Sequence, residues 1–218
     1  VEHINLTAGP QVSSPQVCQV LIGGRPTAGQ LVNCLDLHTL IIPFAGLPGE
    51  IRSISLDRPD LRIFNLHHNA QITAELAMAL LFAATKFVIA HDQLLRKGDW
   101  TLRYHNPPKA LQLAGKRTLV IGYGQIGQRV AVMCQAIGMV VTALQRSHSK
   151  SQAAGGIRLE QSQKLREILP ETDVIILACP LTDETRGLIG REELTLMPAG
   201  SVLVNIANCH VALEQPQQ

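Results

Sequence analysis

Three glycines in the stretch LVIGYGQIGQRVA, namely Gly122, Gly124 and Gly127, recur at the spacing G-x-G-x-x-G. The pattern follows a short apolar run and opens a helical one, the context in which it binds the pyrophosphate of a dinucleotide. Gly122 permits the tight turn, Gly124 lets the backbone approach the phosphates, and Gly127 lets the helix pack against the strand. The N–H groups at the start of the helix then face the phosphates. A purely structural glycine-rich turn is the alternative, and the surrounding strand–helix pattern favours the dinucleotide.

A basic, hydroxyl-rich loop follows the next expected strand, at residues 140–144. An acidic residue at the end of this strand would hold the ribose 2′-OH of NAD, and Gln145 stands in its place. Arg146 and Ser147 come next, and an Arg can bind a 2′-phosphate through paired, charge-assisted hydrogen bonds. The loop therefore favours NADP(H) over NAD(H), or relaxed selectivity. A solvated Arg on a surface loop is the alternative.

The composition of the 218 residues is that of a globular protein and excludes several classes. A net charge of +2, without basic runs interleaved with aromatic residues, argues against a nucleic acid partner. The five cysteines include no C-x-x-C pair, so we expect no metal site and no disulfide framework. No apolar stretch reaches the ~18–20 residues of a membrane span, and no signal-peptide pattern opens the sequence. We expect a cytoplasmic protein with no membrane partner.

The first third of the sequence has the pattern of a small parallel-sheet domain. Three short apolar runs, at residues 17–22, 37–42 and 61–66, are typical of strands separated by turn residues. A long helix should follow at about residues 74–97, with Thr73 as its N-cap and apolar residues at helical spacing. Its first half is nearly apolar all round, which indicates a helix buried between other elements.

From residue 117 onwards strands and helices alternate regularly. We predict strands at residues 118–121, 140–144, 173–178 and 201–206, and helices at residues 127–137, 162–169 and 191–196. This alternation implies right-handed βαβ units in one parallel sheet, with ligands at the carboxyl ends of the strands. The predicted fold class is α/β, with a Rossmann-type parallel-sheet domain after a smaller parallel-sheet domain.

Four stretches in order carry a resemblance to a known family: AELAMALLFAATK, GKRTLVIGYGQIGQRVA, CPLTDETRGLIG and ELTLMPAGSVLVNIA. They are similar to the crossover helix, the glycine loop, the PLTxET loop and the strand before the catalytic arginine of the D-isomer-specific 2-hydroxyacid dehydrogenases. That family includes phosphoglycerate dehydrogenase and glyoxylate/hydroxypyruvate reductase, and the resemblance runs from about residue 35 to residue 207. It implies a partial flavodoxin-like substrate domain over residues 1–70 and an NAD(P)-binding Rossmann domain over residues 71–218. It also implies a homodimer.

By this resemblance, several loops would surround the cofactor. Gln125 and Ile126 would touch the pyrophosphate, and residues 180–184 would lie beside the adenosine and the nicotinamide ribose. Ile206 and Ala207 would line the nicotinamide pocket. The cofactor-binding residues expected in all are Gly122, Tyr123, Gly124, Gln125, Ile126, Gly127, Gln145, Arg146, Ser147, Cys179, Pro180, Leu181, Thr185, Ile206 and Ala207.

The catalytic residues of the family are missing from this sequence. Where the family's VNxARG motif has Arg and Gly, this chain has Asn208 and Cys209. Asn carries no charge, so carboxylate binding and carbonyl polarisation should both weaken, and the loss of one such contact costs ~10²–10³ in rate. The family's Glu and His, which lie further downstream, have no counterpart before Gln218. We therefore assign no catalytic residue and expect the Rossmann domain to be incomplete at its C-terminal edge.

Different functions remain open. The first is an oxidoreductase that acts on the CH–OH group of a small 2-hydroxy or 2-keto acid with NAD(P). The stretch PFAGLP is similar to the family's carboxylate-binding loop and would assign Ala45, Gly46 and Leu47 to the substrate. From the residues alone, that stretch is only a turn after a strand. The second is an inactive dinucleotide-binding fragment without the Arg, Glu and His. A sensor of the nicotinamide pool is a third, supported only by the survival of the binding motifs.

Overall fold

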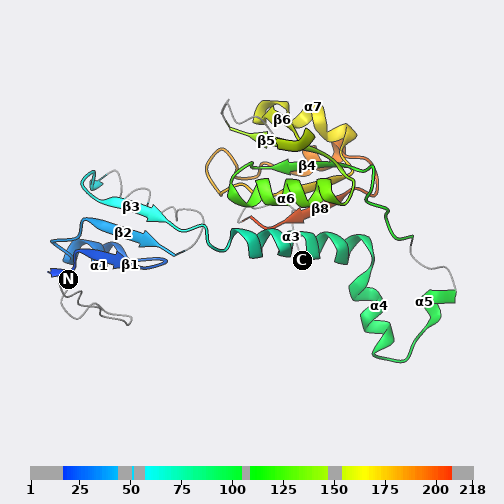
Figure 1. The fold of residues 1–218 in the computed structure, drawn as a ribbon, viewed down its shortest axis with the longest axis horizontal. Coiled ribbons are helices and arrows are strands. Elements are labelled where there is room, and N and C mark those ends of the chain that lie inside the picture. Colours follow the sequence, from blue (N-terminus) through cyan, green and yellow to red (C-terminus); the bar gives the residue numbers. More distant parts are fainter. Residues whose placement is uncertain (1–16, 44–50, 52–56, 105–108, 147–153, 208–218) are drawn as a thin grey trace. The chain divides into compact units, whose positions relative to one another are not determined.

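A computed structural model of the chain describes residues 17–43, 51, 57–104, 109–146 and 154–207. The chain divides between Asn69 and Ala70 into two compact units, both drawn in Figure 1. Each unit has its own parallel sheet and its own hydrophobic core. The fold class is therefore α/β, as the sequence predicts.

The first unit contains a three-stranded parallel sheet and one short helix. The strands pair in the order β1 (Val20–Ile22), β2 (Thr39–Ile42), β3 (Arg62–Asn65), and each lies inside a predicted apolar run. Helix α1 (Ala28–Asn33) begins after Thr27, whose hydroxyl accepts from the N–H of Gln30 while the Gln30 side chain accepts from the N–H of Thr27. The buried residues of this core are Leu31, Cys34, Leu37, Leu40, Ile42, Ile51 and Leu61.

The second unit begins with a helix that differs from its prediction at both ends. Helix α3 (Ala70–Thr85) starts before Thr73, so the prediction of Thr73 as N-cap is wrong. The predicted helix over residues 74–97 is also wrong, because α3 stops and α4 (Val88–Leu95) continues after a bend of 67°. Phe87, between the two helices, has a φ of 54°, in the left-handed region.

The end of α3 has a tertiary cause. The N–H of Leu111 donates to the carbonyl of Thr85 (3.0 Å), and Nζ of Lys86 donates to the carbonyl of Leu111 (2.5 Å). Groups at a helix C-terminus that lack an intrahelical partner need such bonds. The partner is remote in sequence, and α4 keeps the apolar spacing of α3, so periodicity alone predicts one continuous helix.

A five-stranded sheet forms the centre of the second unit (Figure 1). All its strands are parallel and lie in the order β6 (Arg158–Gln161), β5 (Val140–Gln145), β4 (Arg117–Ile121), β7 (Val174–Leu177), β8 (Val202–Asn205). The helices are α5 (Thr101–Tyr104), α6 (Gln125–Ala136), α7 (Leu165–Ile168) and α8 (Arg191–Leu196), with 3-10 turns at Ala154–Gly156, Ser162–Lys164 and Leu169–Glu171.

Two of these elements depart from the sequence-based expectation. Strand β6 has no predicted counterpart, because its sequence RLEQ lacks an apolar run and it pairs only with β5 at the sheet edge. The helix predicted over residues 162–169 is a 3-10 turn, the four-residue α7 and a second 3-10 turn. Pro170 stands in the second turn, where it can neither donate to nor continue an α-helix.

The central strands β4 and β7 are buried on both faces. Val120, Val174 and Ile176 belong to a core cluster with α3 and α6, which pack on the same face of the sheet (Figure 1). Their neighbours on the two strands join a second cluster on the opposite face, with residues of α7 and α8 packed in or against it. Such two-sided burial is typical of parallel sheets covered by helices.

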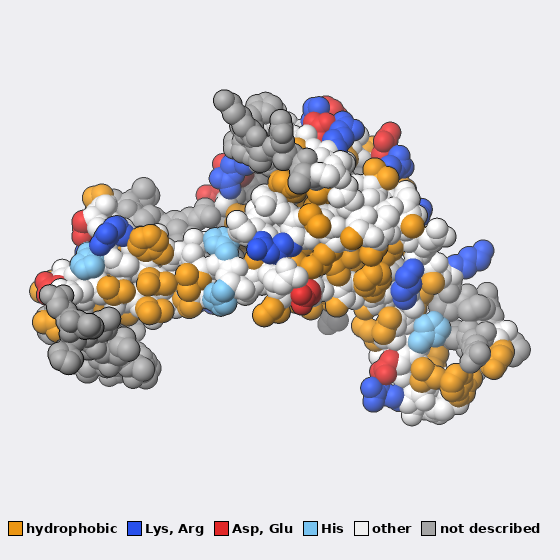
Figure 2. Space-filling view, viewed as in Figure 1, with side chains coloured by type: hydrophobic (Ala, Val, Ile, Leu, Met, Phe, Trp, Pro, Cys, Tyr) orange, Lys and Arg blue, Asp and Glu red, His pale blue; other side chains and the backbone are white. Residues whose placement is uncertain are grey.

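Apolar side chains remain on the surface of α3 and α4, and Figure 2 shows them gathered along these helices. The exposed ones are Ile72, Leu76, Leu80, Phe82, Val88, Ile89 and Leu95. Within the described ranges, no single helix is long and apolar enough to cross a membrane. The bent pair of α3 and α4 meets that test only when both are counted together, by length and composition.

Candidate dinucleotide-binding site

The sheet order places a topological switch point in the middle of the second unit. From β4 the chain runs through α6 to β5 on one side, and it later returns to β7 on the other side. The register pairs Ile121 with both Leu144 and Leu177, so the three strands end at the same level. In open parallel sheets, ligands bind beyond the carboxyl ends of the strands at such a point.

The glycine loop lies at this switch point. Gly122 follows β4, its N–H donates to the carbonyl of Leu144 (3.0 Å), and its φ of 101° lies in a region that L side chains rarely adopt. A Cβ added to Gly122 would lie 2.8 Å from the carbonyl oxygen of Ala178 and from the backbone of Cys179. Gly122 therefore lets β4 turn directly against the segment after β7.

Gly127 fixes the distance between α6 and the strand. A Cβ added there would collide with the carbonyl oxygen of Gly122, and it would lie 2.9 Å from the carbonyl carbon. Gly127 is buried inside α6. The contact brings the first turn of the helix onto the glycine loop itself.

Gly124 is different, because no described atom would contact its Cβ within 4 Å. Gly124 is the N-cap of α6, with a φ of −84° and a ψ of −164°, and it offers no side-chain cap. The first N–H groups of a helix lack intrahelical acceptors and carry partial positive charge. Open space at Gly124 gives a phosphate access to these groups.

Side chains beside the loop support its conformation. The Tyr123 carbonyl accepts from Nε2 of Gln128 (3.2 Å), and the Tyr123 and Ile126 side chains pack partly buried against the core. The Gln125 carbonyl and Oε1 both accept from Nη1 of Arg129, at 2.6 and 2.9 Å. The Arg129 guanidinium group is therefore held against the first turn of α6.

The loop after β5 contributes one exposed cation. Gln145 is half-buried, and Arg146 extends into solvent, where its Nε lies 3.5 Å from Oε2 of Glu184. Glu184 belongs to the loop after β7, so the ion pair joins two loops whose strands flank β4. The predicted Ser147 lies outside the described residues.

The loop after β7 is held by its own hydroxyl groups. Cys179 is buried, Pro180 is exposed and Leu181 is half-buried. The Thr185 hydroxyl accepts from the N–H of Thr182 (2.7 Å) and donates to the carbonyl of Pro180 (2.6 Å). Thr185 is expected beside the cofactor, and its hydroxyl stabilises the conformation of this loop.

Two hydrogen bonds from backbone N–H groups hold the residues that follow β8. The N–H of Ile206 donates to the carbonyl of Leu177 (3.2 Å), and the N–H of Ala207 donates to Oδ1 of Asn205 (3.0 Å). Both residues are half-buried. The predicted substrate residues Ala45, Gly46 and Leu47, and the divergent Asn208 and Cys209, lie outside the described residues.

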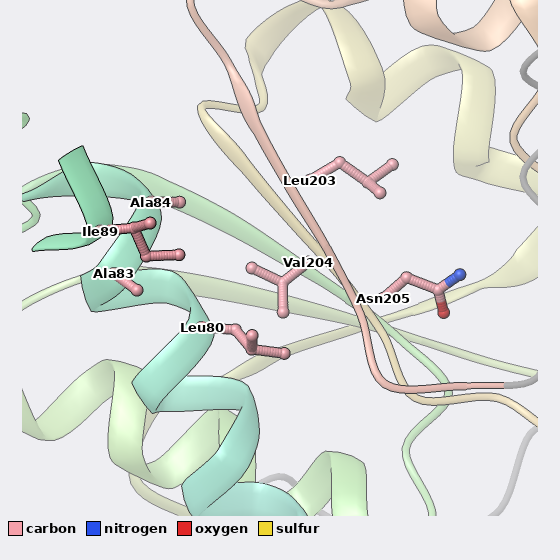
Figure 3. Close-up of a pocket in the computed structure, with 7 residues that line it drawn as sticks. All are labelled: Leu80, Ala83, Ala84, Ile89, Leu203, Val204 and Asn205. Atoms are coloured by element: carbon pink, nitrogen blue, oxygen red, sulfur yellow. The ribbon is translucent and has the colours of Figure 1, made fainter. Parts of the chain in front are cut away.

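A separate pocket of about 320 Å³ lies at the outer strand β8, where Leu80, Ala83, Ala84, Ile89, Leu203, Val204 and Asn205 line it. Figure 3 shows Val204 pointing toward Leu80, whereas Leu203 and Asn205 point to the other side of the strand. These lining residues carry no charge, so the pocket is unsuited to a pyrophosphate. In the part of the chain that the structure describes, no three His, Cys, Asp or Glu residues gather to hold a metal ion.

Two charged contacts at the site were not predicted from sequence. Glu184 faces Arg146, and Arg129 binds the first turn of α6. The second has a local signal, because Gln125 and Arg129 are four residues apart and so share a helix face. The first has none, because it joins loops that only the sheet order brings together.

The all-parallel sheet, its order and the glycine loop at the switch point define a Rossmann-type domain. Residues 78–215 match the family model described as D-isomer specific 2-hydroxyacid dehydrogenase, NAD binding domain. The chain belongs to the D-isomer specific 2-hydroxyacid dehydrogenase family.

Individual relatives agree with this assignment. A glyoxylate reductase of Pyrococcus furiosus is 38% identical over 141 residues, which are 62% of this chain and 41% of that protein. A solved acyclic imino acid reductase in complex with NADPH and D-Arg is 26% identical, with a TM-score of 0.72, over 86% of this chain and 59% of its own. D-lactate dehydrogenase from Aquifex aeolicus, complexed with NAD and lactic acid, shares the fold at 22% identity and a TM-score of 0.74, over 89% and 59% of the two chains. The chain matches less than half of the length of the curated relative.

Proposed function

We propose that this chain binds a nicotinamide dinucleotide at the carboxyl ends of β4, β5 and β7. The observation that carries the proposal is the difference in surroundings among the three glycines of the loop. Gly122 and Gly127 are required by close backbone contacts within the protein, whereas Gly124 has open space at the mouth of α6. Unlike other glycines with open space around them, Gly124 stands at the switch point of the sheet and at the N-terminus of α6, where a pyrophosphate can approach the backbone.

The residues at the site fit such a cofactor. The N–H groups at the start of α6, with Arg129 one turn later, would hold the pyrophosphate. The adenosine would lie between the loop after β5 and the loop of residues 179–185, and the nicotinamide would lie beside Ile206 and Ala207. When bound, the cofactor supplies or accepts a hydride, and this chain binds and orients it.

The cofactor favoured is NADP(H). The strand β5 ends in Gln145 and not in an acidic residue, so nothing at that position repels a 2′-phosphate. Arg146 is exposed, and its two Nη atoms have no hydrogen-bond partner among the described residues. A guanidinium presented in this way can bind a phosphate through two parallel bonds.

The activity that we propose for the protein is oxidation of a small 2-hydroxy acid, or reduction of the 2-keto acid, with NAD(P). Family membership supports the reaction class, and the names of the relatives support small acids as substrates. In this proposal the first unit is a partial substrate domain, the protein forms a homodimer and it resides in the cytoplasm.

A second candidate is a dinucleotide-binding protein without catalysis. The observation in its favour is the sequence Asn208-Cys209 at the position where the family's motif has Arg-Gly. A neutral amide at that position cannot supply the positive charge that orients and polarises a keto acid. In this second candidate function, the protein retains the whole cofactor site and lacks only catalytic turnover.

One experiment separates the candidates. The purified chain of residues 1–218 is titrated with NADPH and NADH by nicotinamide fluorescence and thermal shift. It is then assayed with NADPH and a panel of 2-keto acids that includes glyoxylate and hydroxypyruvate. Binding with turnover supports the oxidoreductase, and binding without turnover supports the second candidate. If neither nucleotide binds, the proposal of a dinucleotide site is refuted.

The matched controls are two glycine variants. Gly124→Val places a branched side chain in the open space at the start of α6, so it should block binding, while the loss of the preferred N-cap residue should cost only about 0.5–1 kcal/mol. Gly29→Ala, in α1 of the other unit, also has no atom within 4 Å of its new Cβ, and it should leave binding unchanged.

A further inference from the structure

We propose that Glu184 sets how strongly the site favours NADP(H), because its carboxylate competes with a 2′-phosphate for Arg146. This inference rests on the proposed dinucleotide site and adds a selectivity-determining residue to it. The observation that carries it is the ion pair between Nε of Arg146 and Oε2 of Glu184, at 3.5 Å.

The position of the pair relates it to the cofactor. Arg146 directly follows β5, and Glu184 lies in the loop after β7. Strand β4 lies between these two strands, and the glycine loop leaves its end. The pair therefore joins the two loops that flank the glycine loop, where the adenosine half of a dinucleotide would extend from α6.

The two partners differ in freedom. Glu184 is part of a turn that is fixed by the Thr185 hydroxyl and by two backbone bonds, from the N–H of Thr185 and of Arg186 to the carbonyl of Thr182. The arginine side chain is long and 64% exposed, and its ion pair with Glu184 joins Nε to Oε2. Arg146 can therefore turn between the carboxylate and a nearby phosphate, while the backbone of the turn that contains Glu184 stays in place.

The electrostatic balance favours the phosphate over the carboxylate. A phosphomonoester carries about −1.5 to −2 charges and three acceptor oxygens, against a single charge for Glu184. A bound 2′-phosphate therefore captures Arg146, and the ion pair of Arg146 with Glu184 must be broken for this to happen. NAD(H) has no such group, so it leaves that ion pair intact.

The magnitude follows from the exposure of the pair. Glu184 is 70% exposed, and exposed ion pairs contribute up to about 1 kcal/mol, which is about fivefold in a dissociation constant. Removal of the Glu184 charge should therefore strengthen NADPH binding by about two- to fivefold. Binding of NADH should change by less than about twofold, and the effect should shrink as salt screens exposed charges.

The test is a double-mutant cycle on the full chain. NADPH and NADH dissociation constants are measured by nicotinamide fluorescence for the wild type, Glu184→Gln, Arg146→Ala and the double variant. The expected result is tighter NADPH binding in Glu184→Gln, weaker NADPH binding in Arg146→Ala, and no effect of Glu184→Gln once Arg146 is removed. Asp183→Asn is the matched control, because it removes the same charge from the neighbouring exposed residue, which forms no ion pair with a described residue.

The outcomes separate this inference from the proposal beneath it. If the wild type binds both nucleotides and Glu184→Gln leaves NADPH affinity unchanged or weakened, the role of Glu184 is refuted and the dinucleotide site stands. The same holds if Asp183→Asn strengthens NADPH binding as much, or if the Glu184→Gln effect persists without Arg146. If the wild type binds neither nucleotide, both proposals are refuted. Thermal midpoints within about 2 °C of wild type verify that these exposed substitutions leave the fold intact.

Discussion

Replacement of Gly127 by Ala should destabilise the second unit more than the same change at Gly124 does. The new Cβ at Gly127 would collide with the Gly122 carbonyl oxygen, which is backbone and cannot rotate away as a side chain would. Either α6 must move outward or the glycine loop must shift. Overpacking of this kind costs about 1–3 kcal/mol and occasionally more. The higher helix propensity of Ala relative to Gly offsets about 0.5–1 kcal/mol of this cost.

Because the obstacle is backbone, we take the upper end of the overpacking cost, about 3 kcal/mol, so the net loss that we expect for Gly127→Ala is about 2–2.5 kcal/mol. For a unit of this size each kcal/mol lowers the thermal midpoint by about 2–4 °C, so the midpoint should fall by about 4–10 °C. At Gly124 the added methyl group meets no described atom within 4 Å. Gly124 is the N-cap of α6, where Gly is preferred to Ala, so the change should cost about 0.5–1 kcal/mol and lower the midpoint by about 1–4 °C.

Chemical denaturation and scanning calorimetry of the two variants measure these changes, and nicotinamide fluorescence measures their nucleotide binding. Gly124→Ala should weaken binding with only the small loss of stability expected at an N-cap, because its methyl group meets no described atom within 4 Å. Equal midpoints for Gly127→Ala and the wild type would refute the assigned packing contact. An equal loss of stability in both variants would show that the distinction between the two glycines is wrong.

Further predictions concern the loops and the core. In Glu193→Gln the bonds from Arg166 weaken, so stability should fall by about 1–2 kcal/mol at pH 7. Burial raises the pKa of Glu193, but bonds from the Gly190 N–H and the Arg166 guanidinium lower this pKa overall. The contribution of the Glu193 carboxylate to stability is therefore full above its pKa in the unfolded chain, and it is lost as the pH falls through its pKa in the folded protein. Denaturation curves of the wild type and Glu193→Gln should therefore converge between pH 7 and pH 3. Thr185→Val leaves the N–H of Thr182 without its acceptor, so hydrogen exchange of that amide should accelerate, while Thr195→Val on the exposed face of α8 should not change it. Burial raises the pKa of Cys134 to about 12, so mass spectrometry should find this thiol unalkylated by iodoacetamide at pH 8 until the protein unfolds.

The sequence predicts those parts of the fold that depend on local pattern. The glycine loop follows an apolar strand and opens an amphipathic helix, and the structure places it at the switch point of the sheet. Strands β4, β5, β7 and β8 are apolar runs, so their positions follow from composition and spacing. The packing roles of Gly122 and Gly127 follow from the same pattern.

The features that sequence does not predict depend on remote partners. Hydrogen bonds of Thr85 and Lys86 with Leu111 lie at the end of α3. The spacing of apolar residues does not predict these bonds. Strand β6 is largely polar, and its strand conformation depends on backbone pairing with β5 at the edge of the sheet. The ion pair of Arg146 with Glu184 requires β5 and β7 to stand on either side of β4, which is a property of the sheet order.

The buried face of α3 also shows where the second folding unit begins. The family match starts at Met78, inside α3, yet Ala70, Ala74 and Ala77 are as buried as the residues after it. A chain cut at Met78 would lose the first half of this helix and would uncover the surface of α6 on which it packs. The compact unit starts at Ala70, so the family match and the folding unit begin at different residues.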